Sequence, residues 1–290
     1  MTVVLLLCDG CSIVVRRLFY CCVTIVTQVG QTENDPLLGL LFIPNVRKIA
    51  RFVLLSPLIP LSLHRQSAVA DQAAANIYMT MNELKKAFAA KLLNIKAIKL
   101  QPENPFTWAS GWKSPFYCDN RKTLSYPALR SFVKLELAHA VLEHFPEATA
   151  VAGVATGAIA QGALVADELN LPFCYVRSKP KDHGMQNLIE GTLPEGAKVV
   201  VVEDLISTGG SSLKAVDALR KAGFEVVGMV ASYTYGFPIA EQAFREAGVR
   251  LVTLTDYEHV VAQARETGYI KEEDVEVLHA WRKDPAIWKK

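Results

Sequence analysis

The stretch Val199-Val200-Val201-Val202-Glu203-Asp204-Leu205-Ile206-Ser207-Thr208-Gly209-Gly210-Ser211 decides the fold of this chain. Its four consecutive valines are typical of a central strand that is buried on both faces. Two carboxylates end the run, and a turn of hydroxyl residues and glycines follows. An amphipathic segment, 213–222, then closes at Gly223, which favours a helix with a glycine just after its end. The stretch therefore predicts a strand, an acidic pair, a loop and a helix in direct succession.

The loop and the start of this helix predict a phosphate site. Free backbone N–H groups meet the positive end of the helix dipole there, and both attract anions. The acidic pair, Glu203 and Asp204, would repel a phosphate, so it suits a ligand that also carries hydroxyls or positive charge. A ribose 5-phosphate offers a phosphate, hydroxyls and a developing charge at its anomeric carbon. The alternative is a plain strand–turn–helix with a capping acid. Neither Gly-x-x-x-x-Gly-Lys-Ser/Thr nor Gly-x-Gly-x-x-Gly occurs in the sequence.

Strand and helix patterns alternate around this centre. Because strands that alternate with helices form right-handed crossovers, we expect an α/β fold whose parallel sheet has helices on both faces. Ligands of such sheets bind at the carboxyl ends of the strands, where the acidic pair falls. A helix capped by Asn82 precedes this region, and the small residues of 158–163 predict close packing of a helix on the sheet. The expected strands are 149–154, 173–176, 198–203, 226–235 and 250–253, and the expected helices are 126–144, 158–170, 211–222 and 239–247, with two more in 256–290.

Composition separates the first 78 residues from the rest of the 290-residue chain. Residues 1–78 hold only six Lys/Arg and four Asp/Glu, against 25 of each in residues 79–290, and the net charge is +2. This balance does not favour nucleic acid or an anionic membrane as a partner. The apolar runs of 1–78 are shorter than the roughly 20 residues of a membrane-spanning helix. We expect translation to start at Met79 or Met81 and residues 1–78 not to be native; a targeting or anchoring extension is the alternative.

Cysteines point to a reducing compartment. Cys118 and Cys174 have no partner with a disulfide-like spacing, so we expect a cytoplasmic protein. The other four cysteines, Cys8, Cys11, Cys21 and Cys22, could suggest a metal site, but no His lies near them and their flanks are apolar. We therefore expect no protein-bound metal site.

Two further segments carry candidate chemistry. The segment 177–191 contains Arg177, Lys179, Lys181 and His183 and then runs through glycines, after the expected strand 173–176. A solvated basic loop is the plain interpretation, whereas a flexible cationic lid would stabilise a departing pyrophosphate. The segment 104–121 is aromatic and rich in turns. Its rings could stack on a flat anionic base beside Lys113, or form the core of a small subdomain.

Together these three segments resemble the orotate phosphoribosyltransferases. The resemblance covers about residues 81–290. It rests on Phe-Thr-Trp-Ala-Ser-Gly in the aromatic segment 104–121, on Tyr-Val-Arg-Ser-Lys-Pro-Lys at the start of the basic segment, and on Val-Val-Glu-Asp-Leu-Ile-Ser-Thr-Gly-Gly-Ser in the acidic stretch. It implies a type I phosphoribosyltransferase fold over 79–290. This fold has a small hood (about 81–125), a core (about 126–255) and C-terminal helices (256–290). The implied substrates are orotate and phosphoribosyl pyrophosphate (PRPP), with Mg²⁺ held mainly through PRPP.

The resemblance also implies roles for individual residues. Glu203 and Asp204 would contact the ribose hydroxyls and, with Lys181, act in catalysis. In this family the basic loop also reaches the second subunit of a homodimer, so that the active sites are shared. The implied PRPP-binding residues are Arg177, Lys181, His183, Glu203, Asp204, Leu205, Ile206, Ser207, Thr208, Gly209, Gly210 and Ser211, and the implied orotate-binding residues are Ser207, Lys113, Phe116 and Tyr117.

The sequence departs from other branches of the family at the base site. Those branches carry Lys at the positions of Ala109, Gly157 and Ser178, and an Arg in the region 233–235. The group that holds the orotate carboxylate is therefore open, with Lys113 or backbone amides of the hood as candidates. Two alternatives remain: a transferase for another base, and a PRPP-sensing regulator that binds nucleic acid. The near-neutral body of the chain disfavours the second.

Overall fold

The computed structural model describes residues 80–108, 111–179 and 188–288, together with five short strands before residue 79. The chain divides into two compact units, Met1–Met79 and Thr80–Lys290. In the first unit, β1 (Leu5–Cys8), β2 (Cys11–Val14) and β4 (Val26–Thr27) form one sheet, and β3 (Val23–Thr24) pairs with β5 (Phe42–Ile43). The interpretation of residues 1–78 as a non-native extension stays a prediction.

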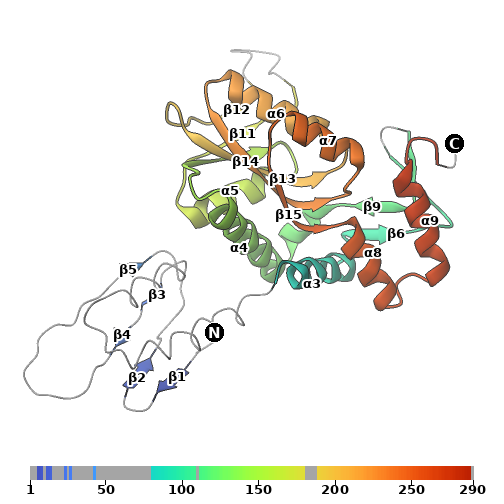
Figure 1. Ribbon diagram of the computed structural model, residues 1–290, viewed down its shortest axis with the longest axis horizontal. Helices are drawn as coiled ribbons and strands as arrows, with labels where there is room; N and C mark the ends of the chain where they lie inside the picture. The colour runs from blue at the N-terminus through green and yellow to red at the C-terminus, as the bar shows by residue number, and fades with distance from the viewer. Residues whose placement is uncertain are drawn as a thin grey trace, which may run out of the picture. The chain divides into compact units, whose positions relative to one another are not determined.

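A six-stranded sheet forms the centre of the second unit (Figure 1). Its order is β12-β11-β10-β13-β14-β15, and every neighbouring pair is parallel except β11 and β12. This confirms the expected α/β class and the five expected strands; the short antiparallel β12 was not predicted. The strands are β10 (Ala150–Val154), β11 (Phe173–Val176), β12 (Ile189–Glu190), β13 (Lys198–Ile206), β14 (Glu225–Thr234) and β15 (Leu251–Asp256).

Helices cover both faces of this sheet (Figure 1). One face packs against α4 (Pro127–His144) and α5 (Ile159–Leu169), and the other against α6 (Gly210–Lys221) and α7 (Pro238–Glu246). The four valines of β13 alternate between these two cores, and all four are fully buried. The valine run therefore confirms the expected central strand.

Close packing between α5 and β10 depends on two glycines. A Cβ atom on Gly162 would lie 3.1 Å from the Cα of Gly153 and 2.9 Å from the Phe173 ring. A Cβ on Gly153 would lie 2.8 Å from the Ala158 carbonyl oxygen. The small residues predicted to allow close packing of this helix on the sheet do so. The helix in turn places the residues just before it at the carboxyl end of the parallel strands.

Gly162→Val is therefore expected to lower the free energy of unfolding by about 1–3 kcal/mol, because added methyl groups force apart a packed interface. Ala163→Val is the matched control, since Ala163 is the next residue of α5 and is exposed. Urea unfolding of both variants measures the difference. Equal stability of the two variants would show that the α5–β10 contact has room to spare.

The hood consists of a helix and two short two-stranded sheets. Helix α3 (Met81–Asn94) leads into β6 (Ile98–Leu100), which pairs with β9 (Phe116–Cys118). Between them, β7 (Phe106–Thr107) pairs with β8 (Lys113–Ser114), and the 3₁₀ helix η2 (Asn120–Ser125) leads into α4. The short strands and turns agree with the prediction for 104–121.

The helix cap expected at Asn82 was wrong. Thr80 caps α3, because its hydroxyl accepts from the Glu83 N–H at 3.2 Å while the Glu83 carboxylate accepts from the Thr80 N–H at 2.7 Å. This reciprocal arrangement is a capping box. Asn82 lies inside the helix, and its side chain contacts His259.

Two helices end the described chain, as predicted for 256–290. Helix α8 (Tyr257–Glu266) packs beside α3, and α9 (Glu272–Lys283) follows it. Among the helices in the described part of the chain, none has the length and apolar character that a membrane crossing requires.

Candidate active site

The acidic pair lies within β13, which continues beyond it to Ile206 and is longer than predicted. Glu203 is buried, with 4% of its surface exposed. One of its carboxylate oxygens accepts from Ser212 Oγ of α6 at 2.8 Å, and the other accepts from the Asp204 N–H at 2.9 Å. Each carboxylate oxygen of Glu203 therefore has its own donor, one from the strand and one from the helix that follows it.

Asp204 lies on the side of the site that faces the hood. Its carboxylate packs against Gly157, in the connection after β10, and fills the space that any side chain there would need. The Asp204 carbonyl accepts from Asn120 Nδ2 at 2.6 Å, which ties β13 to η2. Gly157 is one of the positions where other branches carry Lys, and here its missing side chain makes room for Asp204.

A buried chain of polar contacts supports this tie. Thr123 Oγ1 donates to the Asn120 carbonyl at 2.7 Å and accepts from Gln161 Nε2 at 3.1 Å. Gln161 Oε1 in turn accepts from Ser232 Oγ of β14 at 2.8 Å. Because these buried groups satisfy one another, they hold η2, α5 and β14 in one arrangement. Sequence reasoning missed this network, although Asn120 lies in the aromatic segment 104–121.

Both carboxyls titrate above their ordinary range. Burial raises the pKa of Glu203 well above the usual value, and the negative charge of Asp204 raises it further. Burial also raises the pKa of Asp204, although the nearby Arg121 charge opposes this. These pKa values are higher in the folded chain than in the unfolded one. As the pH rises above the ordinary carboxyl range, ionisation of the pair therefore destabilises the folded state. This destabilisation is typical of a site built to meet positive charge.

The loop after β13 leads directly into α6. Its helix has Gly209 as the N-cap with φ +81° and no capping side chain. A Cβ on Gly209 would also lie 2.9 Å from the Phe244 ring, so both the backbone and the packing require glycine. Ser207 and Thr208 are half-buried, and Gly210 and Ser211 are exposed. The loop thus presents an uncapped helix N-terminus at an open surface, as an anion site requires.

Two residues of the predicted PRPP set, Leu205 and Ile206, lie at the end of β13 and pack within the fold. Ile206 is fully buried, and its carbonyl accepts from the Tyr235 N–H at 3.0 Å. Ile206 is thus enclosed by the sheet, and its expected PRPP contact stays a prediction. Leu205 is half-buried beside it and packs against the core.

Arg177 follows the last residue of β11 and starts the basic segment. Its guanidinium pairs with the Glu190 carboxylate of β12 at 3.3 Å, and its backbone N–H donates to the Leu188 carbonyl at 2.8 Å. A cavity of 320 Å³ lies between Arg177 and α6, and Ser211 and Lys214 also line it. The structure therefore brings Arg177, just after β11, and Ser211, in α6, to one cavity. Lys181 and His183 lie outside the described residues.

The hood residues predicted to contact orotate divide into two kinds. Lys113 is exposed, and its Nζ donates to Thr107 Oγ1 at 2.9 Å; Tyr117 is also exposed, at 36%. Phe116, in contrast, is fully buried and stacks on Tyr233 with ring centroids 5.8 Å apart. The Phe116 ring therefore packs as a core residue that supports the hood. Its predicted contact with orotate stays a prediction.

Comparison with known proteins identifies the family. A family model described as a phosphoribosyl transferase domain matches residues 136–263. The orotate phosphoribosyltransferase of Bacteroides fragilis is 73% identical over 208 residues, which cover 72% of this chain and 98% of the relative. The chain belongs to the orotate phosphoribosyltransferase family. The Porphyromonas gingivalis orotate phosphoribosyltransferase is 66% identical over 208 residues, or 72% of this chain and 99% of the relative.

A solved structure supports the fold of this orotate phosphoribosyltransferase family member. Orotate phosphoribosyltransferase from Aeropyrum pernix aligns with a TM-score of 0.55 and 30% identity, over 63% of this chain and 99% of that one. The predicted type I phosphoribosyltransferase fold is thus confirmed. The comparisons agree with the resemblance seen in the hood, the basic segment and the acidic stretch.

Proposed function

We propose that this chain transfers ribose 5-phosphate from PRPP to orotate and gives orotidine 5-monophosphate and pyrophosphate. The observation that carries the proposal is the acidic pair of β13, with Glu203 buried and Asp204 half-buried, which leads straight into the uncapped N-terminus of α6. This order suits a ribose 5-phosphate, whose hydroxyls face the acids and whose phosphate faces the helix. The chain's membership of the orotate family specifies the base.

In this reaction a ring nitrogen of orotate forms a bond to the anomeric carbon while the bond from that carbon to pyrophosphate breaks. Positive charge develops on the ribose in the transition state. Asp204 and Glu203 meet this charge as carboxylates, in a buried place where electrostatic interactions are stronger than in water. The network around Asn120 holds Asp204 in place beforehand. No enzyme nucleophile is needed, so catalysis consists of positioning and electrostatics.

Magnesium fits this site as a cofactor held mainly by substrate. Among the described residues, no group of three or more His, Cys, Asp or Glu side chains could hold a metal ion. Mg²⁺ commonly binds one or two carboxylates together with phosphate oxygens, and Glu203 and Asp204 are the carboxylates in reach of such a complex. When bound, the ion would neutralise charge on the pyrophosphate. The residues that would carry the remaining charge are Arg177, Lys181 and His183.

The proposal includes a homodimer with shared active sites and a cytoplasmic location. The segment between Arg177 and β12 is long for a strand connection in an α/β fold, which usually takes about 2–6 residues. A long basic excursion can reach a second subunit, and in a two-fold dimer such an exchange is reciprocal. Family resemblance supports this arrangement.

Loss of orotate absorbance with PRPP and Mg²⁺ tests the proposed reaction. Reactions without PRPP, and with uracil, adenine or hypoxanthine in place of orotate, are the controls. We expect pyrophosphate release with orotate alone among these bases. Release with a different base would make the chain a transferase for that base. Salt-dependent binding of RNA or DNA without turnover would make it a regulator.

A further inference from the structure

The turn between β14 and α7, residues 235–237, borders the candidate site. It follows β14, which neighbours β13 on the side away from β10. The Tyr235 N–H donates to the carbonyl of Ile206, which immediately precedes the phosphate loop. Tyr235 itself packs against Trp108 of the hood, with ring centroids 5.3 Å apart. Any shift of this turn would therefore reach both the end of β13 and the hood.

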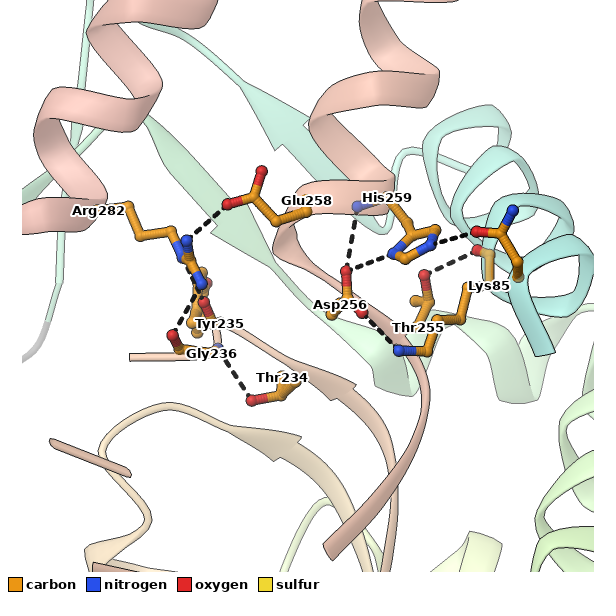
Figure 2. Close-up of polar contacts among 10 residues, drawn as sticks. Lys85, Thr234, Tyr235, Gly236, Thr255, Asp256, Glu258, His259 and Arg282 are labelled. Atoms are coloured by element: carbon orange, nitrogen blue, oxygen red, sulfur yellow. Dashed lines mark hydrogen bonds and ion pairs between the residues drawn. The ribbon is translucent and has the colours of Figure 1, made fainter. Parts of the chain in front are cut away.

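Arg282 of α9 holds this turn from outside (Figure 2). Its Nε donates to the Tyr235 carbonyl at 3.0 Å, and Nη2 donates to the Gly236 carbonyl at 2.8 Å. The third nitrogen, Nη1, pairs with Glu258 of α8 at 2.6 Å. Gly236 has φ +60°, and a Cβ there would lie 2.9 Å from Nη2, so the glycine allows the guanidinium to approach the backbone.

Aromatic packing also supports the turn, since Tyr235 and Phe237 are each 2% exposed and both rings pack against Trp281. A cavity of 650 Å³ opens beside it and is lined by Thr234, Gly236 and Arg282, among others. The two hydrogen bonds from Arg282 hold the backbone of the turn where it borders this cavity. Hydrogen bonds from a charged donor are roughly twice as strong as those between neutral groups.

The neighbouring residue, Trp281, holds the hood in the same way. It is fully buried, and its Nε1 donates to the Lys113 carbonyl of β8 at 3.1 Å. Its ring is parallel to that of Phe116 within 5° and meets Trp108 edge-on. Two adjacent residues of one helix therefore fix the hood strand that carries Lys113 and the turn bonded to Ile206.

We propose that Trp281 and Arg282, which we call the α9 clamp, position the two walls of the orotate-binding side of the active site. This inference rests on the proposed function. Neither residue touches the acidic pair or the phosphate loop in the contacts described, and the turn reaches that loop only through its backbone bond to Ile206, so the clamp should act more strongly on the base than on PRPP. Both are positioning residues.

The clamp predicts a selective kinetic defect. Arg282→Gln should raise the KM for orotate by about tenfold, because misplacing binding groups by about 1 Å can cost up to about a hundredfold. The KM for PRPP should stay within about twofold, since ground-state contacts to that substrate are unchanged. Trp281→Phe, which keeps an aromatic ring but removes the indole N–H, should raise the KM for orotate in the same direction.

Three further variants separate positioning from plain ion pairing. Arg282→Lys keeps the charge beside Glu258 but lacks the planar fork that reaches two carbonyls, so it should not restore orotate affinity. Glu258→Gln removes the ion pair alone and should leave both KM values near wild type. Arg265→Gln is the matched control, because Arg265 pairs with Glu272 at the exposed junction of α8 and α9.

Hydrogen exchange of the 235–237 turn provides a readout besides activity. Faster exchange there in Arg282→Gln, with a raised KM for orotate alone, is the expected result. Full recovery in Arg282→Lys, equal rises of both KM values, or an unchanged KM for orotate despite faster exchange would each overturn the clamp. Wild-type protein that does not turn over orotate would instead count against the proposed function, whatever the variants do.

Discussion

Asp204→Asn is expected to lower kcat by about 10²–10³-fold while the KM for PRPP changes little. In the proposed mechanism the carboxylate faces charge that develops only in the transition state, so its loss should appear in kcat. Asparagine has nearly the same shape, so it still fits beside Gly157. Steady-state kinetics with both substrates, at a pH where wild-type activity is maximal, measures the effect.

Folding should survive this substitution. Because burial raises the pKa of Asp204, the ionised carboxylate costs folding free energy at neutral pH, and a neutral amide removes that cost. The melting temperature of Asp204→Asn should therefore equal or exceed that of the wild type. Asp167→Asn, an exposed acid on α5, is the control and should change neither kcat nor stability. An unchanged kcat with a raised KM for PRPP would make Asp204 a binding group, and the proposed mechanism would fail.

Most of the core could be predicted from the sequence, because its signals are local. The valine run, the alternating apolar segments and Gly223 specify strands and helices without reference to distant residues, and their bounds agree with the structure to within about three residues. Glu203 and Asp204 could be placed at the carboxyl end of a strand for the same reason. The missed β12 is two residues long, too short to show a period.

What could not be predicted depends on contacts between distant residues. The cap of α3 is an exception: Thr80 and Glu83 are only three residues apart, so this local signal was present in the sequence, but the prediction named Asn82 instead. Phe116 has the composition of a stacking residue, but its burial depends on Tyr233 and on Trp281, which is more than 160 residues away. The role of Gly157 also became visible only when the Asp204 side chain was seen to occupy its space.

A co-refolded mixture of Lys181→Ala and Asp204→Asn is expected to recover about a quarter of wild-type activity, although each parent homodimer is nearly inactive. If the basic segment of one subunit completes the site of the other, a mixed dimer has one site with both defects and one with neither. Random pairing makes about half of the dimers mixed, and each has one intact site of two. The two proteins are unfolded and refolded together, and orotate turnover is then measured.

The design needs two controls, because low recovery has more than one cause. Wild-type protein refolded in parallel gives the yield of active enzyme, and each variant refolded alone gives its residual activity. Differently tagged subunits allow the mixed dimers to be purified, and their activity per dimer should then be about half that of wild type. Purified mixed dimers that are as inactive as their parents would show that the segment serves its own subunit. In that case each subunit would hold one of the two defects, and neither site could be complete.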